Sequence, residues 1–484
     1  MQQSYDVLVI GAGPAGTMAA LHACELGARV AVVEKHRTGG TCTNTGCVPT
    51  RVLAKTARTL RDIRSAGTYG IQVGEPSVVW SQTRERVKQV IEEVHGNKRV
   101  SDNIRAAGGD LFMEAATFCS PHEVRLADSG QVLRADKIIL CVGGHSRRLP
   151  IPGVEHALYP EDILELEELP RSVAIVGSGY TGVQLVTVMN AFGAQVTLLE
   201  MLPNVLPMAD RDVGEVLRES FVKQGVTVET GIKGVERIEL LDDGQRRLVY
   251  TADDQEKTVE CDAVFLCAGW PASTEGLGLD AIGVEVEKGF IKVNEYLQTS
   301  VPHIFVAGDA NGQGMLVQGA HFEAYVAAEN AVRGVTQTFK HDLLPNGGFT
   351  DPDHAGVGLT EEQARKEHPD CLVAVAHFAD LDRAIIDDRK VGFLKLIADR
   401  ETMLVIGAHA AGEHAVEVIQ AVATAMAAEV KATTLAGIEL AYPTYTAIVG
   451  MAASHLAPDA GHATVRPIAR PDRIGSKHED RSEL

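Results

Sequence analysis

Cys42 and Cys47 are the residues whose type and spacing best suit chemistry. They lie in the segment GGTCTNTGCVPTR of residues 39–51, and apolar positions continue at helical spacing through about Arg64. This pattern predicts a helix that holds Cys47 at its N-terminal end. Free N–H groups and the partial positive charge at a helix N-terminus favour a thiolate over a thiol. A thiolate is the form that attacks disulfides, so the segment predicts a redox-active cysteine pair.

Two other interpretations of the pair are weaker. A structural zinc site usually needs four ligands in two short-spaced pairs, and no second Cys or His pair stands at a matching distance. We therefore expect no metal site. Two unreactive buried thiols would not need the surrounding glycines. The other cysteines are scattered, and in a reducing compartment a close pair is catalytic or metal-binding more often than a structural staple.

The elements that must position this pair begin with a strand, a glycine turn and a helix near the N-terminus. An apolar strand over residues 5–10 runs into the turn GAGPAG, an alanine-rich helix follows from about Thr17 to Leu26, and a second strand over residues 28–33 ends on Glu34. Glycines allow a tight turn and a close approach to a pyrophosphate, which the helix N-terminus attracts. Glu34 is then placed to accept hydrogen bonds from ribose hydroxyls, so the unit predicts a bound dinucleotide.

The same unit recurs over residues 173–200, with the turn GSGYTG and a second strand over residues 195–199 that leads to Glu200. The distance from first glycine to acid is the same in both copies. One such turn is a weak signal, but two matched copies with strand, helix and acid in place imply two dinucleotides.

Glu200 also bears on the choice of coenzyme. A carboxylate suits a free 2′-hydroxyl and repels a 2′-phosphate. Met201 and Leu202 follow it, and the next arginine is Arg211. We therefore expect NAD(H) at the second turn in preference to NADP(H).

These motifs together resemble those of the pyridine nucleotide–disulfide oxidoreductases, the family of dihydrolipoamide dehydrogenase, glutathione reductase and mercuric reductase. Four further segments resemble the family's sequences, and the likeness spans residues 4–456. They are IILCVGG at 138–144, HIFVAGDA at 303–310, FTDP at 349–352 and VGLTE at 357–361.

The resemblance implies FAD as cofactor, with NADH giving a hydride to the flavin. Cys47 would be the flavin-proximal sulfur and Cys42 the interchange thiol that meets the substrate. Asp309 would hold the flavin's sugar chain. Tyr180 would cover the nicotinamide pocket or, alternatively, pack on the sheet. The cofactor-binding residues expected are Gly11, Gly13, Gly16, Glu34, Gly40, Thr41, Arg51, Gly143, Gly177, Gly179, Tyr180, Gly182, Gln184, Glu200, Gly269, Asp309 and Ala320.

Two departures from the family concern charge beside the flavin. The family's usual Lys and Glu are replaced here by Arg51 and Gln184. Arg stays charged at any working pH, so the pair is one unit more positive than usual. We hypothesise that this stabilises reduced, anionic flavin and raises its potential.

The third departure concerns the acid–base group. Disulfide-reducing members carry His-Pro near the C-terminus with a Glu five residues after the His. This chain has Tyr442-Pro443 and Ala447. Tyr has an unperturbed pKa of about 10 against about 6.5 for His, and acid–base help is typically worth about 10²–10⁴-fold in rate. We therefore expect slow dihydrolipoamide oxidation unless the Tyr442 pKa is strongly perturbed.

Other histidines are poorer candidates for the base. For His409, His414 and His455 a structural or surface role is the better interpretation. The family implies a homodimer, with Tyr442 reaching the partner's cysteine pair, so the site would exist only in the dimer.

The expected function is electron transfer from NADH through flavin and the cysteine pair to a disulfide or dithiol, either a small molecule or a lipoyl group on a protein. The first alternative is a metal-ion reductase of mercuric type. Against it stand a last cysteine at Cys371 and no metal-binding module before Tyr5. The second alternative is a redox-sensing flavoprotein with negligible turnover.

We expect an α/β chain with two Rossmann-like domains and a C-terminal α+β dimerisation domain. The FAD domain would take residues 1–150 and 271–345, the NAD domain 151–270 and the dimerisation domain 346–456, with a poorly ordered tail at 457–484. The net charge of −20 argues against nucleic acid as partner. No apolar run long enough for a membrane span and no export signal are present, so we expect a cytoplasmic protein.

Overall fold

The computed structural model describes residues 3–341 and 343–456. The predicted tail at 457–484 lies outside them. The chain forms two compact units. Unit 1 runs from the N-terminus to Pro207 and continues over Arg218–Leu344, whereas unit 2 combines Met208–Leu217 with the chain from Pro345 onward.

Unit 1 contains a seven-stranded sheet of order β3-β2-β1-β6-β5-β4, with β16 paired to β6. The central strand β1 aligns Ile10 with Val33 of β2 and Leu140 of β6. Three strand ends therefore meet where the first glycine turn begins. The strands are β1 (Gln3–Ile10), β2 (Val30–Val33), β3 (Asp110–Phe112), β4 (Ala116–Ser120), β5 (Glu123–Leu126), β6 (Val132–Leu140) and β16 (Ile304–Val306).

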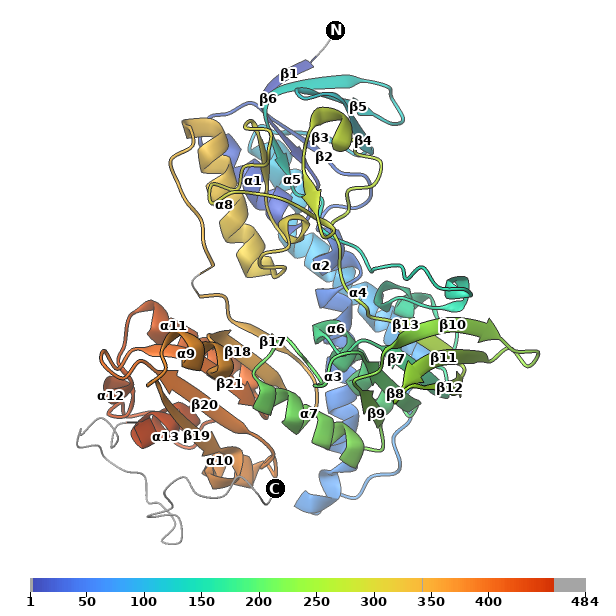
Figure 1. Cartoon of the computed structure of the whole chain (residues 1–484), viewed down its shortest axis with the longest axis vertical. Helices are drawn as coiled ribbons and strands as arrows, with labels where there is room; N and C mark the ends of the chain where they lie inside the picture. The colour runs from blue at the N-terminus through green and yellow to red at the C-terminus, as the bar shows by residue number, and fades with distance from the viewer. Residues whose placement is uncertain (1–2, 342, 457–484) are drawn as a thin grey trace. The chain divides into compact units, whose positions relative to one another are not determined.

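Helices cover the parallel part of this sheet. The helices α1 (Pro14–Glu25) and α8 (Val317–Arg333) lie side by side (Figure 1). Alanines dominate the buried positions of both helices, and such small side chains let the two backbones approach closely. The helix α5 (Val100–Ala106) packs against α1.

The cysteine segment forms two helices, α2 (Gly40–Asn44) and α3 (Cys47–Arg64). The helix α3 buries Leu53, Ala57 and Leu60 and exposes charged residues on its other side. It packs against α4 (Trp80–Lys98) and α6 (Tyr180–Ala191). The predicted helix through Arg64 is thus present, whereas the short helix α2 was not predicted.

The second glycine turn belongs to a four-stranded parallel sheet of order β13-β7-β8-β9, accompanied by a three-stranded antiparallel sheet. Its strands are β7 (Ser172–Val176), β8 (Gln195–Glu200), β9 (Thr227–Thr230) and β13 (Ala263–Leu266). The others are β10 (Gly234–Leu240), β11 (Arg246–Ala252), β12 (Gln255–Cys261), β14 (Val286–Glu287) and β15 (Phe290–Ile291). A small hairpin, β14–β15, packs instead on the core of the first sheet.

Unit 2 is built on a five-stranded antiparallel sheet of order β17-β18-β21-β20-β19, with α11 packed on β18 and β21 and α13 packed on β19 and β20. The strands are β17 (Asn346–Gly348), β18 (His354–Gly358), β19 (Leu372–His377), β20 (Phe393–Ala398) and β21 (Val405–Ala411). The helices are α9 (Glu361–Glu367), α10 (Asp382–Ile386), α11 (Ala415–Ala427), α12 (Ala432–Leu435) and α13 (Ala447–Leu456). Two parallel-sheet regions and this α+β unit confirm the predicted fold class.

The segment Met208–Leu217, which includes the start of α7 (Arg211–Lys223), groups with unit 2 although the sequence placed it in the NAD domain. The segment contributes to an ion cluster around the buried Lys395. Lys395 of β20 lies 2.8 Å from Asp210, 2.7 Å from Asp212 and 2.8 Å from Glu361. These contacts join the segment to β20 and α9 within unit 2.

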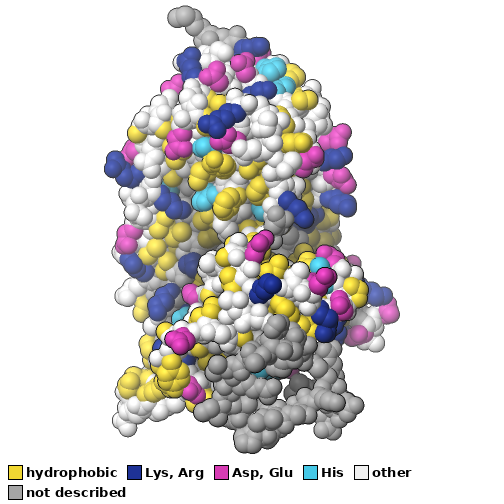
Figure 2. All heavy atoms as spheres, turned by 90° about the vertical axis from the view of Figure 1, so that its left-hand side faces the viewer, with side chains coloured by type: hydrophobic (Ala, Val, Ile, Leu, Met, Phe, Trp, Pro, Cys, Tyr) yellow, Lys and Arg dark blue, Asp and Glu magenta, His cyan; other side chains and the backbone are white. Residues whose placement is uncertain are grey.

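Among the described residues, none of the helices is long and apolar enough to cross a bilayer. On the face drawn in Figure 2, basic and acidic side chains are interspersed.

Candidate active site

The cysteine pair is held by a tight turn between two helices of unit 1. Cys42 lies within α2 and Cys47 is the first residue of α3. Gly46 between them donates its N–H to the Thr41 carbonyl at 2.7 Å. A Cβ at Gly46 would lie 3.1 Å from that oxygen, so a larger residue would crowd the turn. Gly46 caps α3 without a side-chain hydrogen bond, so N–H groups of the first turn stay open beside Cys47. A hydrogen bond from the backbone N–H of Cys47 itself helps to lower the Cys47 pKa.

The two sulfurs differ in electrostatics. A hydrogen bond from the Cys42 thiol lowers the pKa of Cys47 to about 7, burial opposes this, and the Arg51 guanidinium assists it. The same hydrogen bond and burial raise the pKa of the Cys42 thiol. This arrangement favours the thiolate form at Cys47 and the thiol form at Cys42.

Two charged side chains lie close to the pair, namely Asp309, which the sequence had named for the flavin, and Lys98, which it had not named. The Lys98 ammonium lowers the pKa of Cys42, and the Asp309 carboxylate acts in the opposite direction on both thiols. Lys98 donates to the Thr43 hydroxyl at 3.2 Å. Its charge also helps burial to lower the pKa of His321 on α8, which places a neutral imidazole in the same neighbourhood.

The first glycine turn has the geometry of a pyrophosphate cradle. Gly11 has φ of +102°, and a Cβ there would lie 2.2 Å from the Cys141 carbonyl oxygen. A Cβ at Gly16 would lie 1.8 Å from the Gly11 oxygen. Gly13 caps α1 without a side chain and faces Gly40, whose Cβ would lie 2.8 Å from the Gly13 Cα. Open backbone N–H groups at a helix N-terminus fit the phosphates of FAD.

Glu34 at the end of β2 braces this turn. Its carboxylate accepts from the Ala12 N–H at 2.7 Å and from the His36 N–H at 2.9 Å. The residue is buried. The expected contact of Glu34 with a ribose stays a prediction. The structure shows in addition that Glu34 holds the glycine turn in place through these two hydrogen bonds.

The second turn repeats this construction. A Cβ at Gly177 would lie 2.4 Å from the Cys267 oxygen, and one at Gly182 would lie 1.9 Å from the Gly177 oxygen. Glu200 accepts from both the N–H and the hydroxyl of Ser178 at 2.7 Å, and from the Leu202 N–H at 2.8 Å. Gly179 caps α6 without a side chain. The residues present therefore fit a second dinucleotide.

Asp309 begins the 3₁₀ turn η5 (Asp309–Asn311) after β16. Burial raises the pKa of its carboxyl group, and Trp270 Nε1 donates to its Oδ2 at 2.9 Å. The preceding Gly308 donates its N–H to Glu323 at 2.6 Å. Ala320 packs close by, 3.4 Å from where a Gly308 Cβ would be. These contacts fix the segment that was expected to hold the flavin's sugar chain.

Three other expected cofactor residues lie in loops or in the short helix α2. Gly143 and Gly269 both have positive φ, and a Cβ at Gly269 would lie 3.1 Å from Arg147 Nε. Thr41 lies in α2 and accepts the Gly46 N–H through its carbonyl.

Arg51, Tyr180 and Gln184 lie on the packed helices α3 and α6. Gln184 Nε2 donates to the Tyr180 carbonyl at 2.8 Å. Tyr180 is half-buried at the first residue of α6, and burial raises its pKa. The Gln184 amide is thus oriented by its own helix, a role that a carboxylate could not take because it cannot donate.

Tyr442 belongs to unit 2. Its hydroxyl donates to Asp382 Oδ2 at 2.8 Å, and this hydrogen bond raises the Tyr442 pKa. The side chain is largely exposed, at 77%. The neighbouring Tyr445 makes a matching bond to Asp387 at 2.9 Å. A tyrosine held in this way is a hydrogen-bond donor rather than a base at neutral pH.

The three histidines considered above have local partners or exposed positions. His409 is buried and pairs with the Leu359 carbonyl at 2.8 Å. His455 lies on α13 and pairs with the Val375 carbonyl at 3.0 Å. His414 caps α11 and is partly exposed. Among the described residues, no group of three or more His, Cys, Asp or Glu side chains could hold a metal ion.

Comparison with known families decides the assignment. The profile of the pyridine nucleotide-disulphide oxidoreductases matches residues 5–324, and that of the family's dimerisation domain matches residues 344–453. The chain belongs to this family. It is a flavoprotein disulfide oxidoreductase of the lipoamide dehydrogenase and mercuric reductase type, as the sequence predicted, and the family implies FAD and NAD(P) as cofactors.

Relatives of this oxidoreductase carry two different names. It is 32% identical to the dihydrolipoyl dehydrogenase of Chlorobaculum parvum, over 94% of this chain and 98% of the relative. It is 30% identical to the mercuric reductase of Lysinibacillus sphaericus, over 88% of this chain and 78% of the relative. Among solved structures it is similar to the HOCl-induced flavoprotein disulfide reductase RclA from Escherichia coli, with a TM-score of 0.82 and 26% identity over 93% of this chain and 99% of that chain.

Proposed function

We propose that this oxidoreductase passes electrons from NADH, through FAD and the Cys42–Cys47 pair, to a disulfide. The observation that carries the proposal is the asymmetry of the two sulfurs, with the Cys47 pKa lowered to about 7 and the Cys42 pKa raised. Such a pKa difference is needed if Cys42 is to meet the acceptor as a thiol while Cys47 faces the flavin as a thiolate. FAD, when bound, would relay two electrons from the nicotinamide to the disulfide.

The proposed acceptor half-reaction uses the two thiols in turn. Cys42, after giving up its proton, attacks one substrate sulfur, and the first substrate thiol leaves with a proton. Cys47 then attacks Cys42, re-forms the Cys42–Cys47 disulfide and releases the second substrate thiol. Two electrons thus move to the substrate together with two protons, one from Cys42 and one from solvent because Cys47 reacts as the thiolate, and the pair ends oxidised.

The coenzyme of the proposal is NADH. Glu200 is buried and held by three hydrogen bonds at the end of β8. A carboxylate fixed there repels a 2′-phosphate and accepts a 2′-hydroxyl.

Tyr442 serves in this proposal as a hydrogen-bond donor to the leaving thiolate, contributed by the partner subunit of a homodimer. In the resting chain the single hydroxyl proton is donated to Asp382, so in this proposal the hydroxyl turns from Asp382 to the thiolate when that charge develops. The chain carries the family's dimerisation domain, which supports such an arrangement. A lipoyl group, free or on a protein, is the first substrate to test, because the relatives include dihydrolipoyl dehydrogenases.

The test is anaerobic reduction of the FAD-loaded dimer with one equivalent of NADH, followed by mixing with oxidised lipoamide. We expect a long-wavelength thiolate–flavin charge-transfer band that decays on mixing. Cys47→Ser should abolish the band, whereas Cys42→Ser should keep it and block turnover. No band in the wild-type protein would contradict the proposed electron path.

A metal-ion reductase is the second candidate, favoured by the mercuric reductase relative and by Tyr442 in place of His. A band that forms but persists with lipoamide, and decays with a thiophilic metal ion, would support it. A band that persists with every acceptor would support the redox-sensing alternative instead.

A further inference from the structure

The Trp270 side chain lies between a glycine of one loop and the carboxylate of Asp309. Its indole Nε1 donates to Asp309 Oδ2 at 2.9 Å. The edge of the same ring lies against the backbone at Gly144, where a Cβ would stand 2.4 Å from Nε1 and 2.5 Å from Cδ1. A residue larger than glycine would therefore displace the indole from Asp309. Trp270 and Asp309 are both half-buried.

The loop that carries Trp270 is held by backbone hydrogen bonds. It pairs with the loop that follows β6, and the bridge between Gly144 and Ala272 is antiparallel. Three N–H to carbonyl bonds of 3.0 Å join the two loops: Arg147 to Gly269, His145 to Pro271 and Ser273 to Gly143. Because this backbone is already ordered, Trp270 can hold its partner at little further cost in conformational entropy.

Asp309 needs a hydrogen-bond donor because its surroundings oppose a negative charge. Burial raises the pKa of its carboxyl group, the nearby Glu323 carboxylate on α8 acts in the same direction, and the Trp270 N–H acts against both. The cysteine pair also titrates nearby, since the Asp309 carboxylate acts to raise the pKa values of Cys42 and Cys47. An indole N–H can only donate, so Trp270 favours the carboxylate without adding a charge near the thiols.

We propose that Trp270 is a positioning residue for FAD, which occupies Oδ2 of Asp309 and so presents Oδ1 to a hydroxyl of the flavin's sugar chain. The inference rests on the proposed function, because it requires FAD at Asp309. A hydroxyl donates to an ionised acceptor about twice as strongly as to a neutral one. Trp270 thus acts through Asp309 and not through the sugar itself.

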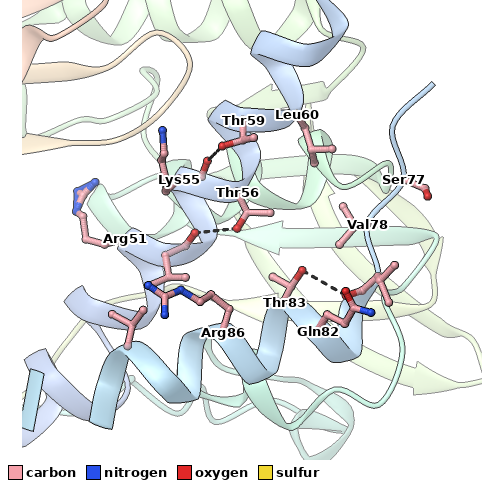
Figure 3. A pocket seen from close by; sticks show the side chains of 13 residues that line it. Arg51, Lys55, Thr56, Thr59, Leu60, Ser77, Val78, Gln82, Thr83 and Arg86 are labelled. Carbon is pink, nitrogen blue, oxygen red and sulfur yellow. Dashed lines mark hydrogen bonds between the residues drawn. The ribbon is translucent and has the colours of Figure 1, made fainter. Parts of the chain in front are cut away.

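The chain has two tryptophans, and the second provides a matched control. Trp80 begins α4, where Gln82 and Thr83 line a groove between α3 and α4 (Figure 3). Its indole N–H donates to the Leu166 carbonyl at 2.8 Å. Substitution of Trp80 therefore removes the same kind of donor, but from a segment that holds none of the expected cofactor residues.

The test is the rate of FAD release from the reconstituted dimer, followed as uptake of the cofactor by an excess of apo-glucose oxidase. Trp270→Phe keeps an aromatic ring but loses the N–H, and release should be about tenfold faster, as expected for one hydrogen bond to a charged group. Trp80→Phe should change the rate by less than about twofold. Benzothienylalanine carries sulfur in place of the indole N–H. When it replaces Trp270 in the Trp80→Phe background, release should be as fast as in Trp270→Phe.

The pH dependence of release distinguishes positioning from packing. Without the N–H, burial and the Glu323 carboxylate act unopposed by Trp270, so the Asp309 pKa rises further and its carboxylate is protonated at a higher pH. As the pH is lowered, FAD release should therefore speed up at a higher pH in Trp270→Phe than in the wild-type protein. The comparison is made within the pH range in which circular dichroism shows an unchanged fold.

Three results would overturn this role of Trp270. They are equal release rates in Trp270→Phe and Trp80→Phe, a benzothienylalanine protein that retains FAD as well as Trp80→Phe does, and a pH profile that Trp270→Phe does not shift. The second result would show that the ring acts by packing alone. Failure of the wild-type dimer to bind FAD would overturn the proposed function, and this inference with it.

Discussion

The Tyr442 hydroxyl donates a hydrogen bond to Asp382 Oδ2 at 2.8 Å. Tyr442 stands where the family resemblance leads one to expect His, and Ala447 stands where it leads one to expect Glu. Asp382 lies on α10, 60 residues before Tyr442 in the chain. The carboxylate raises the Tyr442 pKa further above its ordinary value, so deprotonation becomes harder. The exchange of an imidazole for this phenol replaces an acid–base group with a fixed donor.

Substitutions of Tyr442 and Asp382 should show whether the Tyr442 hydroxyl acts by donating a hydrogen bond or by abstracting a proton. Tyr442→Phe should lower the rate of disulfide turnover by about tenfold to a hundredfold, because one donor to a developing thiolate is lost. Asp382→Asn should have a smaller effect, since the hydroxyl keeps a partner. Stopped-flow decay of the charge-transfer band measures both. A rate unchanged in Tyr442→Phe would remove Tyr442 from the mechanism.

The double variant Tyr442→His/Ala447→Glu should create the acid–base pair that the family uses. We expect dihydrolipoamide oxidation to rise by about tenfold or more, because general acid–base help is worth about 10²–10⁴-fold. Tyr442→His alone should gain less, since nothing fixes its imidazole. NADH formation from NAD⁺ and dihydrolipoamide reports the gain. No gain in the double variant would show that another group already handles the proton.

Reduced protein should show a charge-transfer band whose intensity rises with pH. The Cys47 pKa is lowered to about 7, and the thiolate that forms the band exists only above that value. Arg51→Met should move the midpoint to higher pH, because the guanidinium favours the thiolate. Arg51→Lys keeps the charge and should move it less. A midpoint near the ordinary thiol value in the wild-type protein would contradict the assigned role of Cys42 as donor.

Gln184→Glu should lower the midpoint potential of the flavin. The substitution adds a negative charge on α6 and removes the amide that donates to the Tyr180 carbonyl at 2.8 Å. An anion near reduced flavin disfavours that state. Gln184→Met, which also loses the donor but adds no charge, is the matched control in a spectroelectrochemical titration. Equal potentials in wild type and Gln184→Glu would show that the Arg51–Gln184 departure does not tune the flavin.

The parts of the fold that the sequence predicted are those set by local backbone requirements. A residue with a Cβ cannot occupy Gly11 or Gly177 without meeting a carbonyl oxygen at 2.2 or 2.4 Å. Each turn therefore needs glycine there, and the strand and helix on either side follow from apolar patterns. The helix after Cys47 was likewise predicted from the helical spacing of its apolar residues. The short helix α2 was missed because the run of Gly and Thr in GTCTN gives little helical signal.

The parts that the sequence did not reveal depend on contacts between distant positions. Asp382 and Tyr442 are joined only by folding of unit 2, and the Trp270 contact with Asp309 likewise has no spacing signal. Trp270 could have been suspected, since it follows the expected cofactor residue Gly269. Lys98, which acts on Cys42, has no expected site residue beside it in the sequence, so no sequence signal indicated its role.

The Lys395 cluster gives a prediction about stability. Lys395 and Asp210 are each 2% exposed. Burial acts to raise the Asp210 pKa, but the charge and hydrogen bond of Lys395 outweigh burial, so the Asp210 pKa is lowered. A carboxyl group with a lowered pKa stabilises the fold above its unfolded value of about 3.9, and this contribution is lost as pH falls through the folded value. The Lys395 pKa is raised, so its contribution is full at neutral pH and is lost only at high pH.

Lys395→Met should therefore destabilise unit 2 by about 3–5 kcal/mol, because it leaves the buried Asp210 carboxylate without its ammonium partner. Lys366→Met is the matched control. Lys366 pairs with Glu362 on the surface, with side chains 70% and 80% exposed, and its loss should cost about 0–1 kcal/mol. Urea unfolding of both variants measures the difference. The Lys395→Met penalty should also shrink at acidic pH, where protonated Asp210 no longer needs the ammonium. A penalty that is the same at neutral and acidic pH would show that Lys395 acts through its packed aliphatic stem, and would remove the charge cluster as a stabilising contact of Met208–Leu217 within unit 2.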